Sequence, residues 1–139
     1  MPVSFQIKSS CNLVISRFSG HIHWQDCITA AKAFTADPTA SPAQNHIYDM
    51  RGLTGFDRDY VTFLQMMVDL PDDLFRPPDT RLIVYIAPDR VAQELCNMIL
   101  RSMSAVTGPV ARIVETEAQA AEVLGLRQAQ LADLLAGNV

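Results

Sequence analysis

The charged residues best suited to binding or catalysis lie together at positions 45–59, where the sequence reads NHIYDMRGLTGFDRD. The carboxylates of Asp49, Asp57 and Asp59 surround two guanidinium groups, those of Arg51 and Arg58. Because the acids outnumber the arginines, we interpret these charges as paired locally. The sharper alternative is that one arginine stays free to receive an anionic headgroup or a partner's carboxylate at a helix N-terminus.

A second group that could do chemistry is the histidine pair His21 and His23. In an extended backbone this spacing puts both imidazoles on one face, as a metal pair requires. No acid or cysteine stands at helical or strand spacing to complete a compact ligand set, although Asp26 and Cys27 lie near. We therefore favour an interpretation in which His23 caps a helix and His21 ends a strand, and we predict neither a metal site nor a cofactor.

Motifs typical of catalysis are missing from the sequence. It contains no G-x-S-x-G elbow, and no Lys-Ser/Thr follows Gly52 and Gly55 as in a phosphate-binding loop. The three cysteines show no CxxC spacing, and Cys96 falls within an apolar helical stripe, where a thiol is inert. We predict that the protein has no catalytic residues and is not an enzyme.

The composition is typical of one soluble globular domain. The chain has 139 residues, of which 49% are hydrophobic and 19% charged, enough for a single core. A net charge of −4 argues against binding to nucleic acid or to an anionic membrane surface. The sequence has no apolar run of about 18 residues and no signal peptide, and its widely spaced cysteines suit a reducing compartment. We expect a cytoplasmic protein without stable membrane insertion.

The apolar periodicity predicts alternating strands and helices. Two Val-, Ile- and Phe-rich runs, residues 3–8 and 13–18, are typical of an antiparallel hairpin. Helical spacing of apolar residues begins at Trp24 and ends near Asp37. Further strands are predicted at residues 46–50, 82–87 and 109–114, and further helices at residues 58–70, 88–104 and 116–124. The order ββαβαβαβα predicts a single α/β domain with a mixed five-stranded sheet and a helical extension at residues 126–139.

The glycines Gly52 and Gly55 predict a chain reversal after the strand at residues 46–50. In this interpretation Asp57 is the N-cap of the helix at residues 58–70. Functional residues of open α/β sheets collect at such carboxyl ends of strands, so we place the candidate site here.

The helix predicted at residues 58–70 is unusually apolar. Eight of the eleven residues 60–70 are apolar, so the helix must be covered on more than one side. Three coverings remain open: the protein's own core, a second copy of the chain, or an apolar ligand held against residues 71–79 and 91–103. Phe75, in the proline-rich stretch that follows, lies near enough in sequence to join this region.

Several short motifs resemble the SpoIIAA-like, STAS-related domains of bacteria. These motifs are Phe18-Ser19-Gly20, Tyr48-Asp49-Met50-Arg51 and residues 111–125, and the resemblance covers residues 5–124. It implies a SpoIIAA-like fold and a regulatory interaction role. Structural relatives of the CRAL-TRIO type imply that a lipid site is feasible on this scaffold.

The resemblance fails at one functional position. Antagonist members of the family carry an Asp-aliphatic-Ser-Gly turn before an Asp-Ser pair, whose serine is phosphorylated by a partner kinase. Here Asp49-Met50-Arg51-Gly52 matches the turn and Asp57 the acid, so the phosphorylated position falls on Arg58. An arginine has no hydroxyl to modify, so the usual switch is not expected.

The sequence therefore predicts a non-catalytic interaction module that binds a partner protein, or itself as a homodimer, through residues 60–70 and the preceding turn. Under this hypothesis, Phe63→Asp or Met67→Asp disrupts assembly but leaves a folded monomer. The alternative is a carrier of a small apolar, lipid-like ligand. The residues expected to bind the partner or ligand are Asp49, Arg51, Asp57, Arg58, Tyr60, Phe63, Met67 and Phe75.

Overall fold

The computed structural model describes residues 2–41, 43–69, 82–102 and 110–136. Within these ranges the elements follow one another as β1 (Val3–Lys8), a short 3-10 helix η1 (Ser9–Cys11), β2 (Leu13–Ile22), α1 (Trp24–Ala36), β3 (Asn45–Phe56), α2 (Tyr60–Asp69), β4 (Leu82–Ile86), α3 (Arg90–Ser102), β5 (Val110–Val114), α4 (Glu117–Leu124) and α5 (Gln128–Leu135). The predicted α/β class with a mixed five-stranded sheet is confirmed. Phe75 lies outside the described residues, as does the predicted end of the second helix.

The strands lie in the sheet in the same order as in the chain, from β1 to β5. β1 pairs with β2 antiparallel, and the remaining neighbours pair parallel. The predicted hairpin is therefore confirmed, and Asn12 closes it with a left-handed backbone (φ 53°). Among the described residues, no helix is long and apolar enough to cross a membrane.

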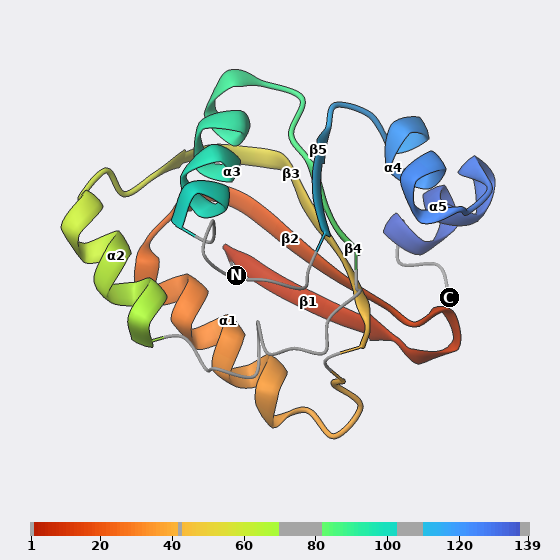
Figure 1. Ribbon diagram of the computed structural model, residues 1–139, viewed down its shortest axis with the longest axis horizontal. Coiled ribbons are helices and arrows are strands. Elements are labelled where there is room, and N and C mark those ends of the chain that lie inside the picture. The colour runs from red at the N-terminus through yellow and green to blue at the C-terminus, as the bar shows by residue number, and fades with distance from the viewer. Residues whose placement is uncertain (1, 42, 70–81, 103–109, 137–139) are drawn as a thin grey trace.

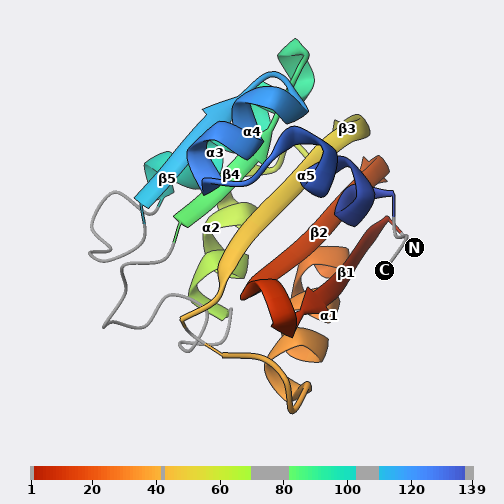
Figure 2. The same ribbon diagram turned by 90° about the vertical axis from the view of Figure 1, so that its right-hand side faces the viewer.

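Helices cover both faces of the sheet (Figure 1). α1, α2 and α3 lie on one face, and α4 and α5 lie on the other, as the turned view in Figure 2 shows. Because neighbouring side chains of a strand point to opposite faces, each face has its own apolar core. Phe18 and Tyr85 pack toward α1–α3, whereas Ile15 and Ile47 pack with Leu131 of α5.

The predicted chain reversal at the two glycines is wrong, because β3 continues through both to Phe56. Gly52 and Gly55 lie beside Ser19 and His21 of β2 in the parallel register. A Cβ atom at Gly55 would lie 3.0 Å from Nδ1 of His21, closer than side chains normally approach. Gly52 and Gly55 thus leave room for the side chains of the neighbouring strand, which is a common role of glycine within strands.

The predicted N-cap of α2 is also wrong. Asp59 caps this helix, since its carboxylate accepts hydrogen bonds from the backbone N (3.2 Å) and the hydroxyl (2.6 Å) of Thr62. α2 accordingly begins at Tyr60 rather than at Arg58. Asp57, two residues earlier, is left for contacts with other elements.

The helix predicted at residues 116–124 is confirmed as α4, and local contacts define both of its ends. Thr116 accepts a hydrogen bond from the backbone N of Gln119 (3.2 Å), so these two residues form a capping box at the start of α4. Gly125 ends that helix in the left-handed conformation (φ 70°). This turn brings α5 onto the sheet, where Leu131 is fully buried.

Candidate functional site

An apolar cavity of about 110 Å³ lies between the sheet and the three helices α1, α2 and α3. Its floor consists of side chains from four neighbouring strands, namely Val3, Phe5, Val14, Ser16, Phe18, His46, Tyr48 and Tyr85. Its walls come from the helices and consist of Trp24, Cys27, Ala30, Ala31, Phe34, Phe63, Met66, Met67, Leu95 and Ile99. None of these residues carries a carboxylate, ammonium or guanidinium group, so the cavity suits an uncharged occupant.

Aromatic rings form most of the floor. Tyr48 stacks on Tyr85 of β4 at 5.1 Å and on His46 of its own strand at 5.9 Å. Phe18 of β2 and Phe34 of α1 meet this row edge-on, at 5.9 Å from Tyr48 and 5.4 Å from His46. Offset and edge-to-face contacts of this kind are the favoured arrangements of aromatic pairs, so the floor is well ordered.

The helix walls are apolar and partly adaptable. Phe63 of α2 is fully buried and packs on the indole of Trp24 at 5.0 Å, and the indole N–H donates to the carbonyl of Asp59 (3.3 Å). Met66 and Met67 complete this wall with flexible side chains that fit irregular shapes. Burial, with a smaller contribution from nearby carboxylates, raises the pKa of Cys27 to about 12, so its thiol stays neutral.

The predicted site residues Phe63 and Met67 therefore face the cavity, whereas Tyr60 points outward. The outer face of α2 carries four exposed apolar side chains, with exposed fractions of 52% for Tyr60, 65% for Val61, 41% for Leu64 and 81% for Val68. These four lie within about 100° of the helix circumference and form one stripe.

Arg51 is paired, and its pairing lies on the opposite face of the sheet from the cavity. Two of its nitrogens donate to the two carboxylate oxygens of Asp49, each at 2.9 Å, and a third donates to Glu117 of α4 at 2.5 Å. Burial raises the pKa of Asp49, but the hydrogen bonds and charge of Arg51 outweigh this effect and hold that pKa below its usual value.

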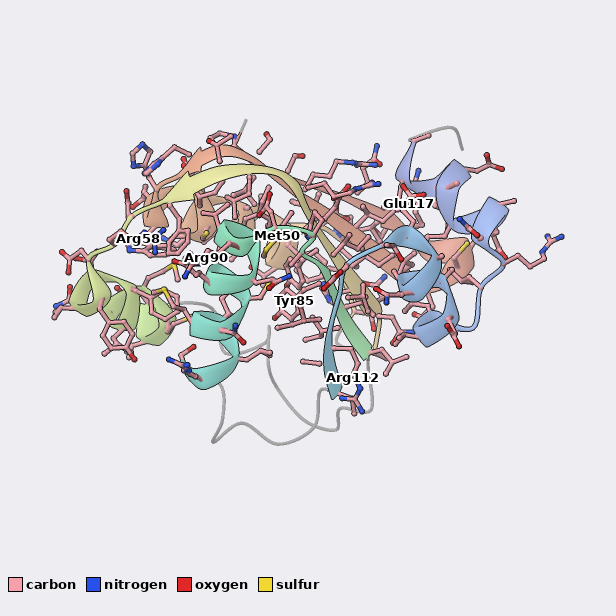
Figure 3. All side chains as sticks on the ribbon, turned by 90° about the horizontal axis from the view of Figure 1, so that it is seen from above. Met50, Arg58, Tyr85, Arg90, Arg112 and Glu117 are labelled. Carbon is pink, nitrogen blue, oxygen red and sulfur yellow. The ribbon has the colours of Figure 1, made fainter. Side chains whose placement is uncertain are left out.

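Arg58 is paired as well, with a partner from another element. It donates to Glu94 of α3 at 2.5 Å, and its guanidinium lies 4.1 Å from the ring centre of Phe56. Figure 3 shows Arg58 near Arg90 of α3, which also approaches Glu94 at 3.8 Å, while Glu117 lies far from both. Arg51 thus pairs with Asp49, which is near it in the sequence. The other carboxylates, Glu117 for Arg51 and Glu94 for Arg58, come from distant parts of the chain.

The carboxylate of Asp57 contacts the side chains of both His21 and His23. One of its oxygens hydrogen-bonds Nε2 of His21 (3.1 Å) and Nδ1 of His23 (3.0 Å), and the other accepts from the backbone N of Trp24 (3.2 Å). Burial raises the pKa of Asp57, but these three hydrogen bonds outweigh it and lower that pKa. Local spacing in the sequence does not reveal this cluster, because its acid comes from the segment after the neighbouring strand. Aligning the second and third strands in parallel would have revealed it, since His21 pairs with Gly55.

Comparisons with known proteins add no family to this geometry. No protein-family model matches the sequence. No curated protein matches it at a significant level either. The SpoIIAA-like assignment therefore stays a prediction.

Proposed function

We propose that this protein binds a small, uncharged apolar molecule between its sheet and α1–α3. The observation that carries this proposal is the apolar cavity, because packed protein interiors contain few voids larger than a water molecule. The proposal corresponds to the carrier alternative of the sequence analysis. Phe63 and Met67, two of the residues expected to bind, line this cavity.

The size of the cavity limits the ligand. Dry apolar cavities of about 150 Å³ bind benzene, so a volume of about 110 Å³ suits one small ring or a short alkyl segment. A ligand that fills the cavity removes apolar surface of the protein and of the ligand from water, which is favourable. The ligand thus stabilises the folded protein as it binds.

The chemistry of the lining defines the class of ligand. The floor offers stacking surfaces from Tyr48 and Tyr85, and its polar groups include the hydroxyl of Ser16. A small aromatic ring or a short alkyl chain that carries at most a few neutral polar atoms fits this lining. A charged ligand does not, because an unpaired charge in an apolar cavity is strongly disfavoured.

Solvent extraction of freshly purified protein followed by gas chromatography and mass spectrometry tests this proposal. We expect wild-type protein to release an apolar compound in near-stoichiometric amount. The variant Ala31→Leu, which narrows the cavity, should release less, and Ala33→Leu, on the exposed side of the same helix, should match wild type. Equal release from all three proteins would locate the compound elsewhere.

A second proposal, interaction with a protein partner or a second copy of the chain, is favoured by the outer stripe of α2. Contiguous exposed apolar side chains mark interaction surfaces, and Tyr60, Val61, Leu64 and Val68 form such a stripe. The variants first suggested for this hypothesis do not test it. Phe63 is fully buried and Met67 faces the cavity, so an aspartate at either position would damage the core.

A further inference from the structure

The histidine–aspartate cluster beside the amino end of α1 has no part in the cavity. It consists of His21 at the end of β2, His23 just before α1 and Asp57 just after β3. One nitrogen or oxygen ligand atom from each residue lies within 4.8 Å of those of the other two. Both histidine side chains are at least half exposed, so an ion in solution can reach them.

The backbone fixes the geometry of this cluster. Ile22, between the two histidines, is fully buried, and its carbonyl accepts a hydrogen bond from the backbone N of Asp57 (3.0 Å). Because the backbone here is extended, burying Ile22 turns both imidazoles outward to the same side. Gly55 leaves the space that the His21 ring occupies, since a Cβ there would lie 3.0 Å from its Nδ1.

The donor atoms define the kind of ion. Two imidazole nitrogens and one carboxylate oxygen form a ligand set of zinc sites that leave a fourth position open. Tetrahedral zinc with bonds of about 2.0–2.1 Å holds its ligand atoms about 3.3 Å apart. Here the carboxylate oxygen lies 3.1 Å and 3.0 Å from the two nitrogens, close to this separation, and all three ligand atoms lie within 4.8 Å of one another.

We propose that His21, His23 and Asp57 bind a divalent transition-metal ion, with Zn²⁺ as the best match. Ca²⁺ and Mg²⁺ fit this ligand set poorly, because both cations prefer oxygen ligands and bind six or more of them. The fourth position is open to water or to a donor atom of a bound molecule.

Groups around the ligands hold them in place. The second oxygen of Asp57 accepts from the backbone N of Trp24, which orients the carboxylate toward the histidines. The backbone N of His23 donates to the carboxylate of Asp26 (3.0 Å), which fixes the start of α1. Such outer contacts orient metal ligands and are part of a functional metal site.

The competing explanation is that the hydrogen bonds of this cluster only stabilise the packing of β2 against β3. The two explanations differ in one measurable property, which is binding of a metal ion by the folded protein. His23 is suited to the test because its side chain is 65% exposed, so its replacement leaves the core intact.

Isothermal titration calorimetry of the tag-free protein with ZnCl₂ tests the proposal. We expect one Zn²⁺ per chain. The variant His23→Gln should weaken binding by at least the roughly 10- to 100-fold seen when supporting residues of metal sites are removed. Asp57→Asn should weaken it similarly, and Gln25→Ala, an exposed neighbour that is not a ligand, should match wild type. Circular dichroism checks that each variant is folded.

Substituting Co²⁺ gives a second readout, because tetrahedral cobalt absorbs visible light strongly and reports the ligand geometry directly. We expect visible absorption from wild type and from Gln25→Ala, and none from His23→Gln. Absence of Zn²⁺ binding to wild type overturns the proposal. Binding that survives unchanged in folded His23→Gln also overturns it, because the ion must then be held elsewhere, for example at a cysteine.

Discussion

Tyr48 stacks on Tyr85 across the parallel pair of β3 and β4, with ring centres 5.1 Å apart and ring planes 15° apart. The two residues are direct neighbours in the register, so their rings form a continuous surface on the face that α1–α3 cover. Both rings line the cavity. This pair therefore both stabilises the pairing of β3 with β4 and shapes the proposed binding site.

Removing one ring of this pair should destabilise the protein. Tyr85→Leu loses the stacking contact and enlarges the cavity, and we expect it to lower the free energy of unfolding by about 1–3 kcal/mol. Tyr60→Leu, at a half-exposed position of α2, is the matched control and should change it by less than about 0.5 kcal/mol. Urea unfolding followed by the fluorescence of Trp24, the single tryptophan, measures both. Equal effects would mean that the stack is not a stabilising contact.

The pairing of Asp49 with Arg51 predicts a pH-dependent contribution to stability. The pKa of Asp49 is lower in the folded protein than its usual value, so the folded state binds fewer protons. The contribution is therefore present above the unfolded pKa of about 3.9 and disappears as the pH falls through the folded pKa.

We accordingly expect Asp49→Asn to lower the free energy of unfolding by about 1–2 kcal/mol at pH 7, a modest value because Arg51 is partly exposed. The difference from wild type should shrink as the pH is lowered below about 4. Urea unfolding at pH 7 and pH 3 measures it, with Asp133→Asn at an exposed position as control. A difference that grows toward pH 3 would contradict this assignment.

The three cysteines should differ in reactivity. Burial raises the pKa of Cys27 and of Cys96 to about 12, so their thiolate fraction at pH 8 is only about one in ten thousand. Titration with a chromogenic disulfide reagent should label Cys11 first in the native protein, and the other two only after denaturation. Rapid labelling of all three in the native state would contradict this order of reactivity.

The outer stripe of α2 predicts the surface through which any assembly forms. Leu64→Asp places a charge in the middle of this stripe and should convert a dimer or complex into a folded monomer. Gln65→Asp adds the same charge at the neighbouring exposed position outside the stripe and should have a smaller effect. Sedimentation velocity measures the outcome. A wild-type monomer with no partner, or a dimer that survives Leu64→Asp, rules out this surface.

Features that depend on neighbours in the sequence could be predicted. The strand predicted at residues 82–87 and the helix predicted at residues 116–124 follow from local patterns, and the structure confirms both. Each depends on hydrogen bonds or burial within a few residues, so a single sequence contains the necessary information.

Features that depend on distant contacts could not be predicted. Gly55 is typical of a turn in the sequence, and only the His21 ring of the adjacent strand explains why it belongs to a strand. Asp57 joins the histidines through the parallel pairing of β2 with β3, which no local spacing reveals. The sequence also does not show which side of α2 faces the core, because a helix that is apolar nearly all round has no distinct apolar face.

The most direct test of the proposed function is the effect of benzene on thermal unfolding of wild type, Ala31→Leu and Ala33→Leu. At ten times its dissociation constant a ligand of the folded state adds about 1.4 kcal/mol, which raises Tm by roughly 3–6 °C for a domain of this size. We predict this rise for wild type and for Ala33→Leu, and little or none for Ala31→Leu, whose side chain occupies the cavity. An unchanged Tm for wild type, or equal rises in all three proteins, would contradict ligand binding in the cavity.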